Sequence, residues 1–320
     1  MPGRFSIDSV QIHDVAMSSA VTFRCVGEVS VDNGMDILTP DSGGSYDEVA
    51  FVGAAKVEGA FACKALESLT DNVPIAAVKC ITADGSHPGV RIFGQLHDPC
   101  GTAGRASGSV HLRITLAKCW LAIQRIAGTV GQSAVATVRI IGGSTDGSAD
   151  PDDQAYNAAL PTTFIANEEF VIAEPTLATG LVFLPDYISG WTYDSGLRIT
   201  TKMGAGSIYN TGIDVEKIQP TLAINHEDPT IIDPAKVPKR GRQVLITQTK
   251  FPLIKRSPFG GLISRASAEH LLMKCEGYCW APRHFAGGGP TPVTGDLNIR
   301  CTEPSGGGAP VTITKDQVIT

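Results

Sequence analysis

Residues 104–123 read GRASGSVHLRITLAKCWLAI, and residues 264–282 read SRASAEHLLMKCEGYCWAP. Both stretches carry Arg-Ala-Ser, a histidine a few residues later and then a Cys-Trp pair. The repeat is either a duplicated catalytic site or a duplicated structural unit. The order of the matches and their nearly constant offset indicate duplication, because self-similarity at a fixed period is typical of repeated architectures. Chance similarity between two β segments is the alternative.

The similarity extends beyond these two stretches. The matched positions are His111 with His270, Cys119 with Cys279, Trp120 with Trp280, and residues 136–141 with 296–301. Between the copies, residues 142–163 are rich in Gly, Ser, Asp and Pro and lack an apolar period, which is typical of a turn followed by a linker. We therefore predict two domains of ordinary size, residues 1–160 and 161–320.

The composition is that of a globular, strand-rich protein. Of the 320 residues, 42% are hydrophobic and only 18% are charged, with 35 Gly and 20 Pro. Abundant turn formers and few charged residues favour β structure over a helical bundle. The net charge of −6 argues against a dedicated nucleic-acid binder, which would carry a basic stripe.

The local patterns predict mostly strands and one helix. Residues 22–32 alternate apolar and polar, as a half-buried strand does. Helical spacing of Ala62, Leu66, Leu69 and Val73 predicts an amphipathic helix over residues 61–72. The other predicted strands are residues 48–57, 77–83, 89–96, 110–117, 136–141, 196–203, 214–225, 243–254, 269–275, 296–301 and 310–314.

The second copy lacks the helix, because three prolines within residues 226–242 forbid a regular one. The expected fold class is mostly β or α+β. It consists of two tandem homologous β-sandwich or barrel-like domains, with a flanking helix in the first.

A structural zinc site is one hypothesis for the second repeat. His270, Cys275, Cys279 and His284 are residue types that zinc prefers, within fifteen positions. Their spacing matches no common zinc-finger pattern, and the first copy keeps only His111 and Cys119. Buried cysteines and turn-flanking histidines are the alternative, and we predict no metal site and no cofactor.

Catalytic signatures are equally weak. The residues His87, His97, Asp98 and Cys100 lie close in sequence, but nucleophilic triads assemble from distant segments. The chain carries no G-x-S-x-G elbow, no Walker phosphate loop and no G-x-G-x-x-G after a strand. We therefore expect that the protein is not an enzyme. The acidic stretch 146–153 could bind calcium, but it lacks EF-hand spacing and is better explained as a solvated linker.

The repeated residues suit assembly better than chemistry. Arginine beside small residues, just before a strand, suits a close approach by another subunit, and a tryptophan suits an interface or core anchor. A basic run could touch phosphate or an acidic patch on a neighbouring subunit, with a plain exposed loop as the alternative. The candidate interface residues are Arg105, Trp120, Arg265, Trp280, Lys239, Arg240 and Arg242.

Targeting signals are not apparent. The N-terminal stretch MPGRFSIDSV has no basic region followed by an apolar run, and no stretch approaches the roughly 20 apolar residues of a membrane helix. The eight cysteines then fit a reducing cytoplasm as small buried apolar side chains.

One arrangement in the first copy resembles a known family. A His-x-apolar-x-apolar strand is followed by a short corner with Trp, and then by a strand that leads to an Asp-Gly turn and Pro in ATVRIIGGSTDGSADP, residues 136–151. This looks like the tail tube proteins of tailed bacteriophages. The resemblance covers most of the first half and the last 60 residues of the second, and no single motif in it is specific.

The resemblance implies a mechanical role in the virion, after assembly in the host cytoplasm. Copies would form hexameric rings, or trimeric rings that imitate hexamers, and the rings would stack with other tail proteins. A net-negative wall would let DNA pass through the lumen without specific binding. The loop 32–47 would reach the ring above or below, and no membrane partner is expected. The alternatives are a double-jelly-roll capsid subunit, another virion protein, or a soluble ligand-binding pair of β domains.

Overall fold

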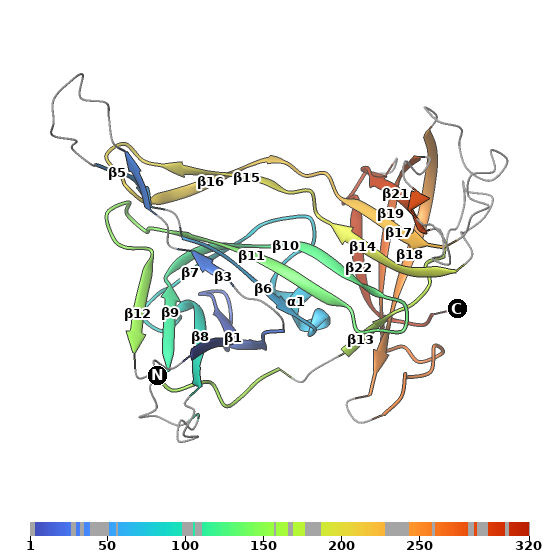
Figure 1. Cartoon of the computed structure of the whole chain (residues 1–320), viewed down its shortest axis with the longest axis horizontal. Coiled ribbons are helices and arrows are strands. Elements are labelled where there is room, and N and C mark those ends of the chain that lie inside the picture. The colour runs from blue at the N-terminus through green and yellow to red at the C-terminus, as the bar shows by residue number, and fades with distance from the viewer. Residues whose placement is uncertain are drawn as a thin grey trace.

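The computed structural model is an elongated molecule built almost entirely from antiparallel strands (Figure 1). It describes residues 4–26, 30–32, 35–38, 51–55, 57–97, 105, 111–156, 158–165, 169–176, 187–227, 243–257, 260–280, 285–286, 294–304 and 307–319. The mostly-β fold class is confirmed. Within these ranges, no helix has the length and apolar character needed to span a bilayer.

A five-stranded sheet forms one layer of the first half. Its order is β12-β9-β8-β1-β2, and its strands are β1 (Arg4–His13), β2 (Val21–Arg24), β8 (Gly89–His97), β9 (Leu112–Leu116) and β12 (Asp152–Tyr156). Val10 and Ile12 of β1 are fully buried, whereas Gln11 between them is not. This alternation points one face of the sheet into the core.

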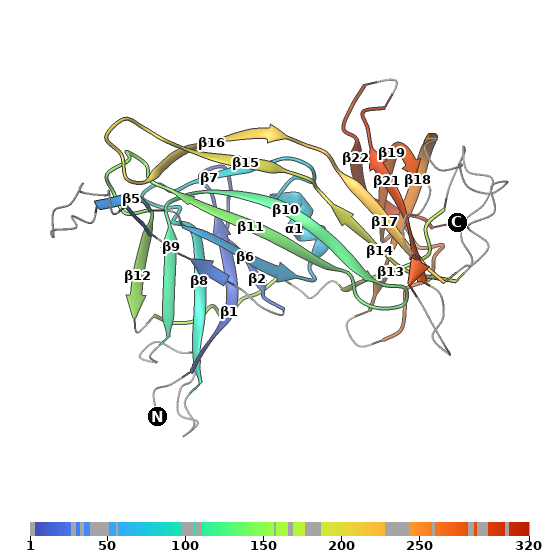
Figure 2. The ribbon, with the colours of Figure 1, turned by 45° about the horizontal axis from the view of Figure 1, so that its top comes forward.

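A larger sheet, thirteen-stranded as far as the structure describes it, runs through both halves. Its main path is β13-β18-β19-β21-β17-β14-β10-β11-β6-β3, with β20 on β21, β22 on β19 and β7 on β10. The strands are β3 (Ser30–Asp32), β6 (Glu58–Cys63), β7 (Lys79–Thr82), β10 (Lys118–Thr129), β11 (Val135–Gly143), β13 (Glu169–Ile172), β14 (Ile188–Asp194), β17 (Thr221–His226), β18 (Gln243–Arg256), β19 (His270–Trp280), β20 (Phe285–Ala286), β21 (Thr294–Cys301) and β22 (Val311–Gln317). In Figure 2 its strands β6, β10 and β11 run side by side at a steep angle to β1, β8 and β9 of the five-stranded sheet.

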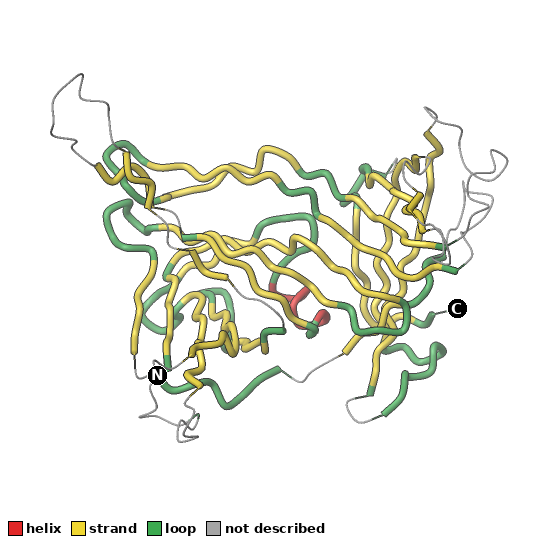
Figure 3. The backbone as a smooth tube through the Cα atoms, viewed as in Figure 1, coloured by secondary structure: helices red, strands yellow, loops and turns green. Residues whose placement is uncertain are grey.

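One helix, α1 (Leu66–Asn72), is seen among the described residues (Figure 3). The predicted stripe is confirmed in part: Leu66 and Leu69 of the helix are buried, as is Val73 directly after it, whereas Ala62 lies in β6 and is only partly buried. The predicted start at residue 61 is wrong. Phe61 and Cys63 belong to β6, where they are buried and pair with β11, so strand pairing overrides the helical spacing there.

Three further predictions need correction. Residues 22–32 are not one strand, because β2 and β3 lie in different sheets. The short corner expected around Trp120 is the beginning of β10, a twelve-residue strand that starts directly after Ala117. The expected linker 142–163 contains β12, which pairs with β9.

The hairpin of β10 and β11 connects the two halves of the chain. Its stem pairs with β6 and β7 of the first half, and Arg125–Thr129 pair with Gly190–Asp194 of β14. Its turn bonds to β13: the amide of Ala134 donates to the carbonyl of Phe170 at 2.7 Å, and the amide of Gly131 donates to Ile172 at 2.9 Å. The hairpin end therefore completes a closed ring of strands, β13-β18-β19-β21-β17-β14, with β10 between its ends.

This closure bears on the predicted domains. The strand β10 precedes residue 160 and β14 follows it, and because the two pair, the larger sheet spans the predicted boundary. The closed ring of strands in the second half is therefore completed by residues of the first half. The matched repeats also differ locally. Residues 112–116 and 118–129 form two strands in two sheets, whereas residues 270–280 form one. The duplication and the boundary at residue 160 stay predictions.

The buried residues of both halves form one apolar cluster. On the first side, Ile92 and Leu116 of the five-stranded sheet pack toward Leu121 and Ile123 of β10. In the second half, the Trp191 and Phe251 rings meet edge to face with centroids 5.2 Å apart. Such aromatic pairs add to the free energy of area burial.

Two hairpins stand apart from both sheets. One pairs β4 (Met35–Leu38), which lies within the predicted ring-contacting loop 32–47, with β5 (Phe51–Ala55), which follows that loop. Residues 33–34 and 39–47 of the loop lie outside the described chain. The other pairs β15 (Arg198–Met203) with β16 (Asn210–Lys217) and runs across the first half in both views (Figures 1 and 2). We call residues 198–218 the ribbon.

The closure can be tested at Gly190. A Cβ at this position would lie 2.5 Å from the carbonyl oxygen of Gly128 on β10, and backbone cannot move aside as a flexible side chain can. Gly190→Ala should lower the free energy of unfolding by about 1–3 kcal/mol, the usual cost of overpacking. Gly261→Ala is the control, because no atom lies within 4 Å of its added Cβ. Equal denaturation midpoints for the two variants would contradict this account of the closure.

Candidate functional site

Trp120 lies beside the place where the ribbon meets the first half. On β10 its neighbours Cys119 and Leu121 point into the core, so Trp120 faces the opposite side of the sheet. It is still only 6% exposed. A Cβ on Gly143 of β11 would lie 2.5 Å from its ring, and the Lys118 ammonium lies 5.5 Å from the ring centroid. The tryptophan is therefore covered on a face that the sheet alone would leave open.

Polar contacts hold the ribbon end beside this ring. The amide of Ser144 donates to the carbonyl of Asn210 at 2.8 Å, and Lys118 Nζ donates to the carbonyl of Thr211 at 2.9 Å. Ser207 Oγ donates to the carbonyl of Gly147 at 2.6 Å. The ribbon is thus attached at its turn to the first half and at its base to β14 and β17 of the second.

Most of the rest of the ribbon is exposed, although Ile199, Thr201 and Ile213 are only partly so. Nine large apolar side chains are exposed among the described residues, and four of them lie between positions 203 and 218: Met203, Ile208, Val215 and Ile218. Val215 pairs across the ribbon with Ile199, and Thr201 pairs with Ile213. Cross-strand partners share a face, so the ribbon has one apolar face and one polar face. The polar face carries the Lys202–Asp214 ion pair and a hydrogen bond from Thr200 to Glu216.

Arg105 lies in an internal clamp. Its guanidinium donates two hydrogen bonds to the Asp8 carboxylate, at 2.9 and 2.8 Å, and a third to the carbonyl of Pro161 at 2.9 Å. The ring of Phe164 lies 5.0 Å from the Arg105 guanidinium and 4.5 Å from that of Arg24. The clamp fastens the segment between β12 and β13 to β1 and β2.

The other predicted interface residues are more scattered. Arg265 is exposed, and its carbonyl accepts a hydrogen bond from the amide of Ile319 at 2.9 Å. Trp280 is the last residue of β19 and pairs with Asn298 of β21; its side chain lies outside the described part. Lys239, Arg240 and Arg242 fall outside the described residues as well. The structure does not bring Arg105 and Trp120 together into one site.

The outer edges of the sheets differ in how they are covered. The free side of β2 is partly occupied, because the amide of Ile165 donates to the carbonyl of Thr22 at 3.1 Å. The free side of β13 bonds to the β10–β11 turn. Within the described chain, β12 and β3 end their sheets with no strand beyond them. Asp152 and Asp153 sit on the β12 edge, and edge charges oppose pairing with another chain.

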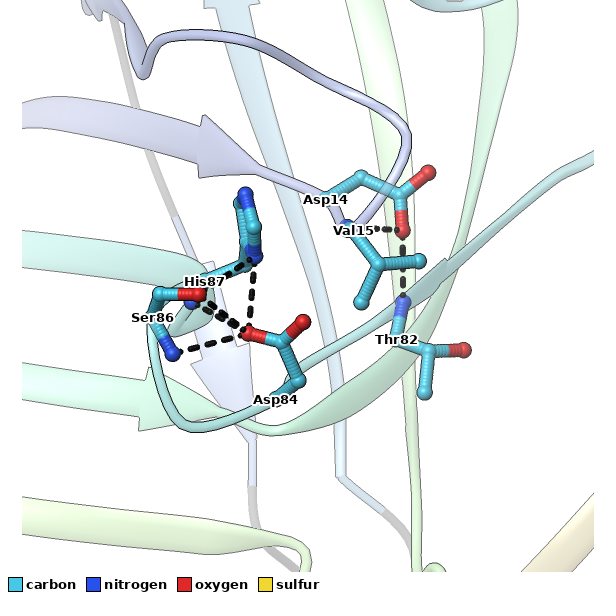
Figure 4. A network of polar contacts seen from close by, with 6 residues as sticks. All are labelled: Asp14, Val15, Thr82, Asp84, Ser86 and His87. Atoms are coloured by element: carbon cyan, nitrogen blue, oxygen red, sulfur yellow. Dashed lines mark hydrogen bonds and ion pairs between the residues drawn. The ribbon is translucent and has the colours of Figure 1, made fainter.

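A Ser-His-Asp cluster in the turn between β7 and β8 has the residue types of a catalytic triad (Figure 4). The Asp84 carboxylate contacts His87 Nδ1 at 2.7 Å, and Ser86 Oγ contacts the same nitrogen at 3.1 Å. A triad instead places the carboxylate on Nδ1 and the hydroxyl on Nε2. The amides of Ser86 and His87 also donate to Asp84, and these bonds hold the pKa of its carboxyl well below the usual range. The cluster caps a turn.

The metal-ligand candidates are dispersed or occupied. His270 accepts a hydrogen bond at Nδ1 from the amide of Lys255 and lies 2.9 Å from the carbonyl of Ser264 at Nε2, so both ring nitrogens have partners. The side chains of Cys279 and His284 are outside the described set. Asp146 accepts bonds from the amides of Ala149 and Ser148, which lower the pKa of its carboxyl to about 2. No three potential ligands among the described residues could hold a metal ion together.

The described cysteines are unpaired thiols, and most are buried. Burial raises the pKa of Cys63 to about 12, and it raises the pKa of Cys119 further. A thiol acts as a nucleophile through its thiolate, so these two side chains are poorly suited to covalent chemistry. Cys100, from the predicted His-Asp-Cys group, lies outside the described residues.

Comparisons with models of known protein families and with curated proteins find no match to this chain. Two features suit a role in contacts between molecules: the exposed apolar ribbon and the tryptophan that anchors it. Sequence reasoning singled out Trp120 from the repeat and predicted strands over residues 196–203 and 214–225, but it did not identify the ribbon that they form as an exposed surface.

The anchor role of Trp120 predicts a specific instability. Trp120→Ala should lower the free energy of unfolding by about 3–5 kcal/mol, since a buried tryptophan is removed. It should also free the ribbon turn, so limited proteolysis should cleave within residues 204–211 before the rest of the chain unfolds. A variant whose ribbon resists protease as the wild type does would contradict the anchor role.

The clamp predicts a pH-dependent contribution to stability. Burial alone would raise the pKa of Asp8, but hydrogen bonds from Arg105 and Ser9 and the Arg105 charge outweigh burial and lower it from 3.8. A lowered pKa in the folded state stabilises the protein above pH 3.8, and this part is lost as the pH falls through the folded-state value. Arg105→Ala should therefore cost about 1–2 kcal/mol near neutral pH, between the values for exposed and buried pairs.

The measurement is urea denaturation of wild type and Arg105→Ala across the acid range. The stability gap should narrow below pH 4, where protonated Asp8 no longer needs the guanidinium. Arg105→Lys is the matched control, because it keeps the charge without the two-pronged geometry, and it should fall between the two. A gap that is the same at every pH would show that Asp8 is not the relevant partner.

Proposed function

We propose that this chain is a virion structural protein that assembles with copies of itself into stacked rings of a bacteriophage tail tube. The ribbon is the observation that carries the proposal. A two-stranded hairpin is only marginally stable in water by itself, and this one, held at its turn and at its base, carries four exposed apolar side chains. Such surfaces on a folded protein mark contacts with another molecule.

A second copy of the chain is the proposed occupant of the ribbon. The described core is extensive and closed, so the strands do not need a partner to fold. The ribbon bridges both halves and ends beside Trp120, so it is held in a defined place and can present its apolar face to a neighbour. A head-to-tail contact of this kind closes into a ring or extends into a filament.

Other features are compatible with a tube. The fold is strand-rich with a short helix beside the first half, as the family resemblance implies. The net charge of −6 would reduce sticking of DNA phosphates to a lumen. Two strand-rich halves in each chain would let three copies present six similar units, provided that the duplication holds.

The role of the ribbon in assembly can be tested by placing a glutamate at two equally exposed positions. Met203 and Val15 are both 47% exposed, and only Met203 lies on the ribbon. Met203→Glu should reduce assembly measured by light scattering coupled to size-exclusion chromatography, because a carboxylate would have to be buried at the contact. Val15→Glu should assemble like wild type. Denaturation midpoints within error of wild type for both variants would show that the fold is intact.

The proposal fails if wild type stays monomeric at high concentration, as seen by the same chromatography and by negative-stain microscopy. It also fails, in its ribbon-specific form, if Met203→Glu and Val15→Glu assemble equally well. A second ribbon variant, Val215→Glu, covers the case in which position 203 alone tolerates a glutamate at the contact.

A further inference from the structure

A pocket of about 390 Å³ lies over β18 and β19, and neither Trp120 nor any residue of the ribbon lines it. It is placed where β19 changes its neighbour from β22 to β21. The segment joining β21 to β22 forms one wall through Pro304, Ala309 and Pro310. The polar lining consists of Lys250, Lys274, Glu276 and Thr312.

Two lysines face each other in this pocket. Lys250 of β18 and Lys274 of β19 are direct cross-strand partners, and Lys274 is also the partner of Thr312 on β22. Direct partners share one face of a sheet, so the three side chains form a row across three strands. Like charges directly opposite each other destabilise a sheet.

No ion pair within the described chain offsets the repulsion between these two lysines. Neither Lys250 nor Lys274 forms a side-chain ion pair or hydrogen bond with another described residue, and both are only partly exposed. Glu276 lies two positions along β19 on the same face, but it makes no ion pair with either lysine. Other half-buried lysines do have partners: Lys64 contacts Glu169 at 3.0 Å, and Lys255 contacts Glu67 at 3.6 Å.

We infer that this pocket binds a small oxyanion, a phosphate or carboxylate group held between Lys250 and Lys274. Two ammonium groups on adjacent strands can each donate a charge-assisted hydrogen bond to separate oxygens of one such group. The Thr312 hydroxyl lies next in the row and supplies a further donor. The volume is at the small end of the range for ligand sites, which suits a group of a few heavy atoms. The inference does not depend on the proposed tube function.

The probe is inorganic phosphate, titrated at constant ionic strength against chloride, with the thermal midpoint and isothermal calorimetry as readouts. Wild type should show a saturable rise in the midpoint, because a ligand of the folded state stabilises it. Lys250→Gln and Lys274→Gln should each weaken binding about ten-fold or more, the loss of one charge-assisted bond. Arg125→Gln is the control, because it removes an exposed strand cation that lies outside the ribbon and does not line the pocket, and it should bind as wild type does.

The stability of the variants without phosphate distinguishes the loss of a binding site from damage to the fold. In phosphate-free buffer, Lys250→Gln and Lys274→Gln should be at least as stable as wild type, because each removes the like-charge pair. A variant that loses binding while keeping stability supports the site. No saturable effect on wild type, or equal binding by wild type and both pocket variants, would overturn the inference.

The source of the oxyanion is resolved by testing dissociated and assembled protein in parallel. Binding by both forms assigns the pocket to a free anion. Binding by the dissociated form alone assigns it to a carboxylate supplied by a neighbouring copy, since that group would already fill the pocket. Absence of binding in both forms overturns the inference, and it leaves the ribbon experiment unaffected.

Discussion

The β10–β11 hairpin is the constraint on which the rest of the structure depends. Its stem lies among the strands of the first half, and its end is inserted between β14 and β13 of the second. The close backbone approach at Gly128 and Gly190 leaves no room for side chains at this crossing. The same hairpin carries Trp120, which faces away from the core and receives the end of the ribbon. One element therefore joins the halves, closes a ring of strands and positions the exposed surface.

This arrangement separates rigid from exposed parts in a way that suits assembly. The apolar cluster is continuous across both halves, so the halves are expected to unfold together. The Arg105 clamp fixes the segment that connects them. The ribbon is different, because it is attached mainly at its ends and carries exposed apolar side chains along its strands and turn. A rigid body that presents a defined apolar arm loses little conformational freedom when the arm docks.

Sequence patterns predicted the strands with clear alternation and missed those defined by long-range pairing. The segments 243–254 and 296–301 were found because their apolar periods or β-branched residues are local signals. The sequence predicts a corner at the start of β10, because the apolar residues there do not alternate with polar ones. They form a strand because both faces of β10 are buried at this point. Residues 61–63 fit a helical stripe, yet pairing with β11 makes them a strand. Trp120 could be singled out from the repeat, but the Lys250–Lys274 pairing required the register of β18 on β19.

The central claim is that copies of this chain join through the ribbon into closed rings. Electron cryo-microscopy of the purified protein at assembling concentrations tests it most directly. The account predicts rings or stacked rings in which residues 198–218 of each copy lie against a neighbouring copy. Particles that remain single chains, or rings in which this ribbon faces solvent, would contradict it.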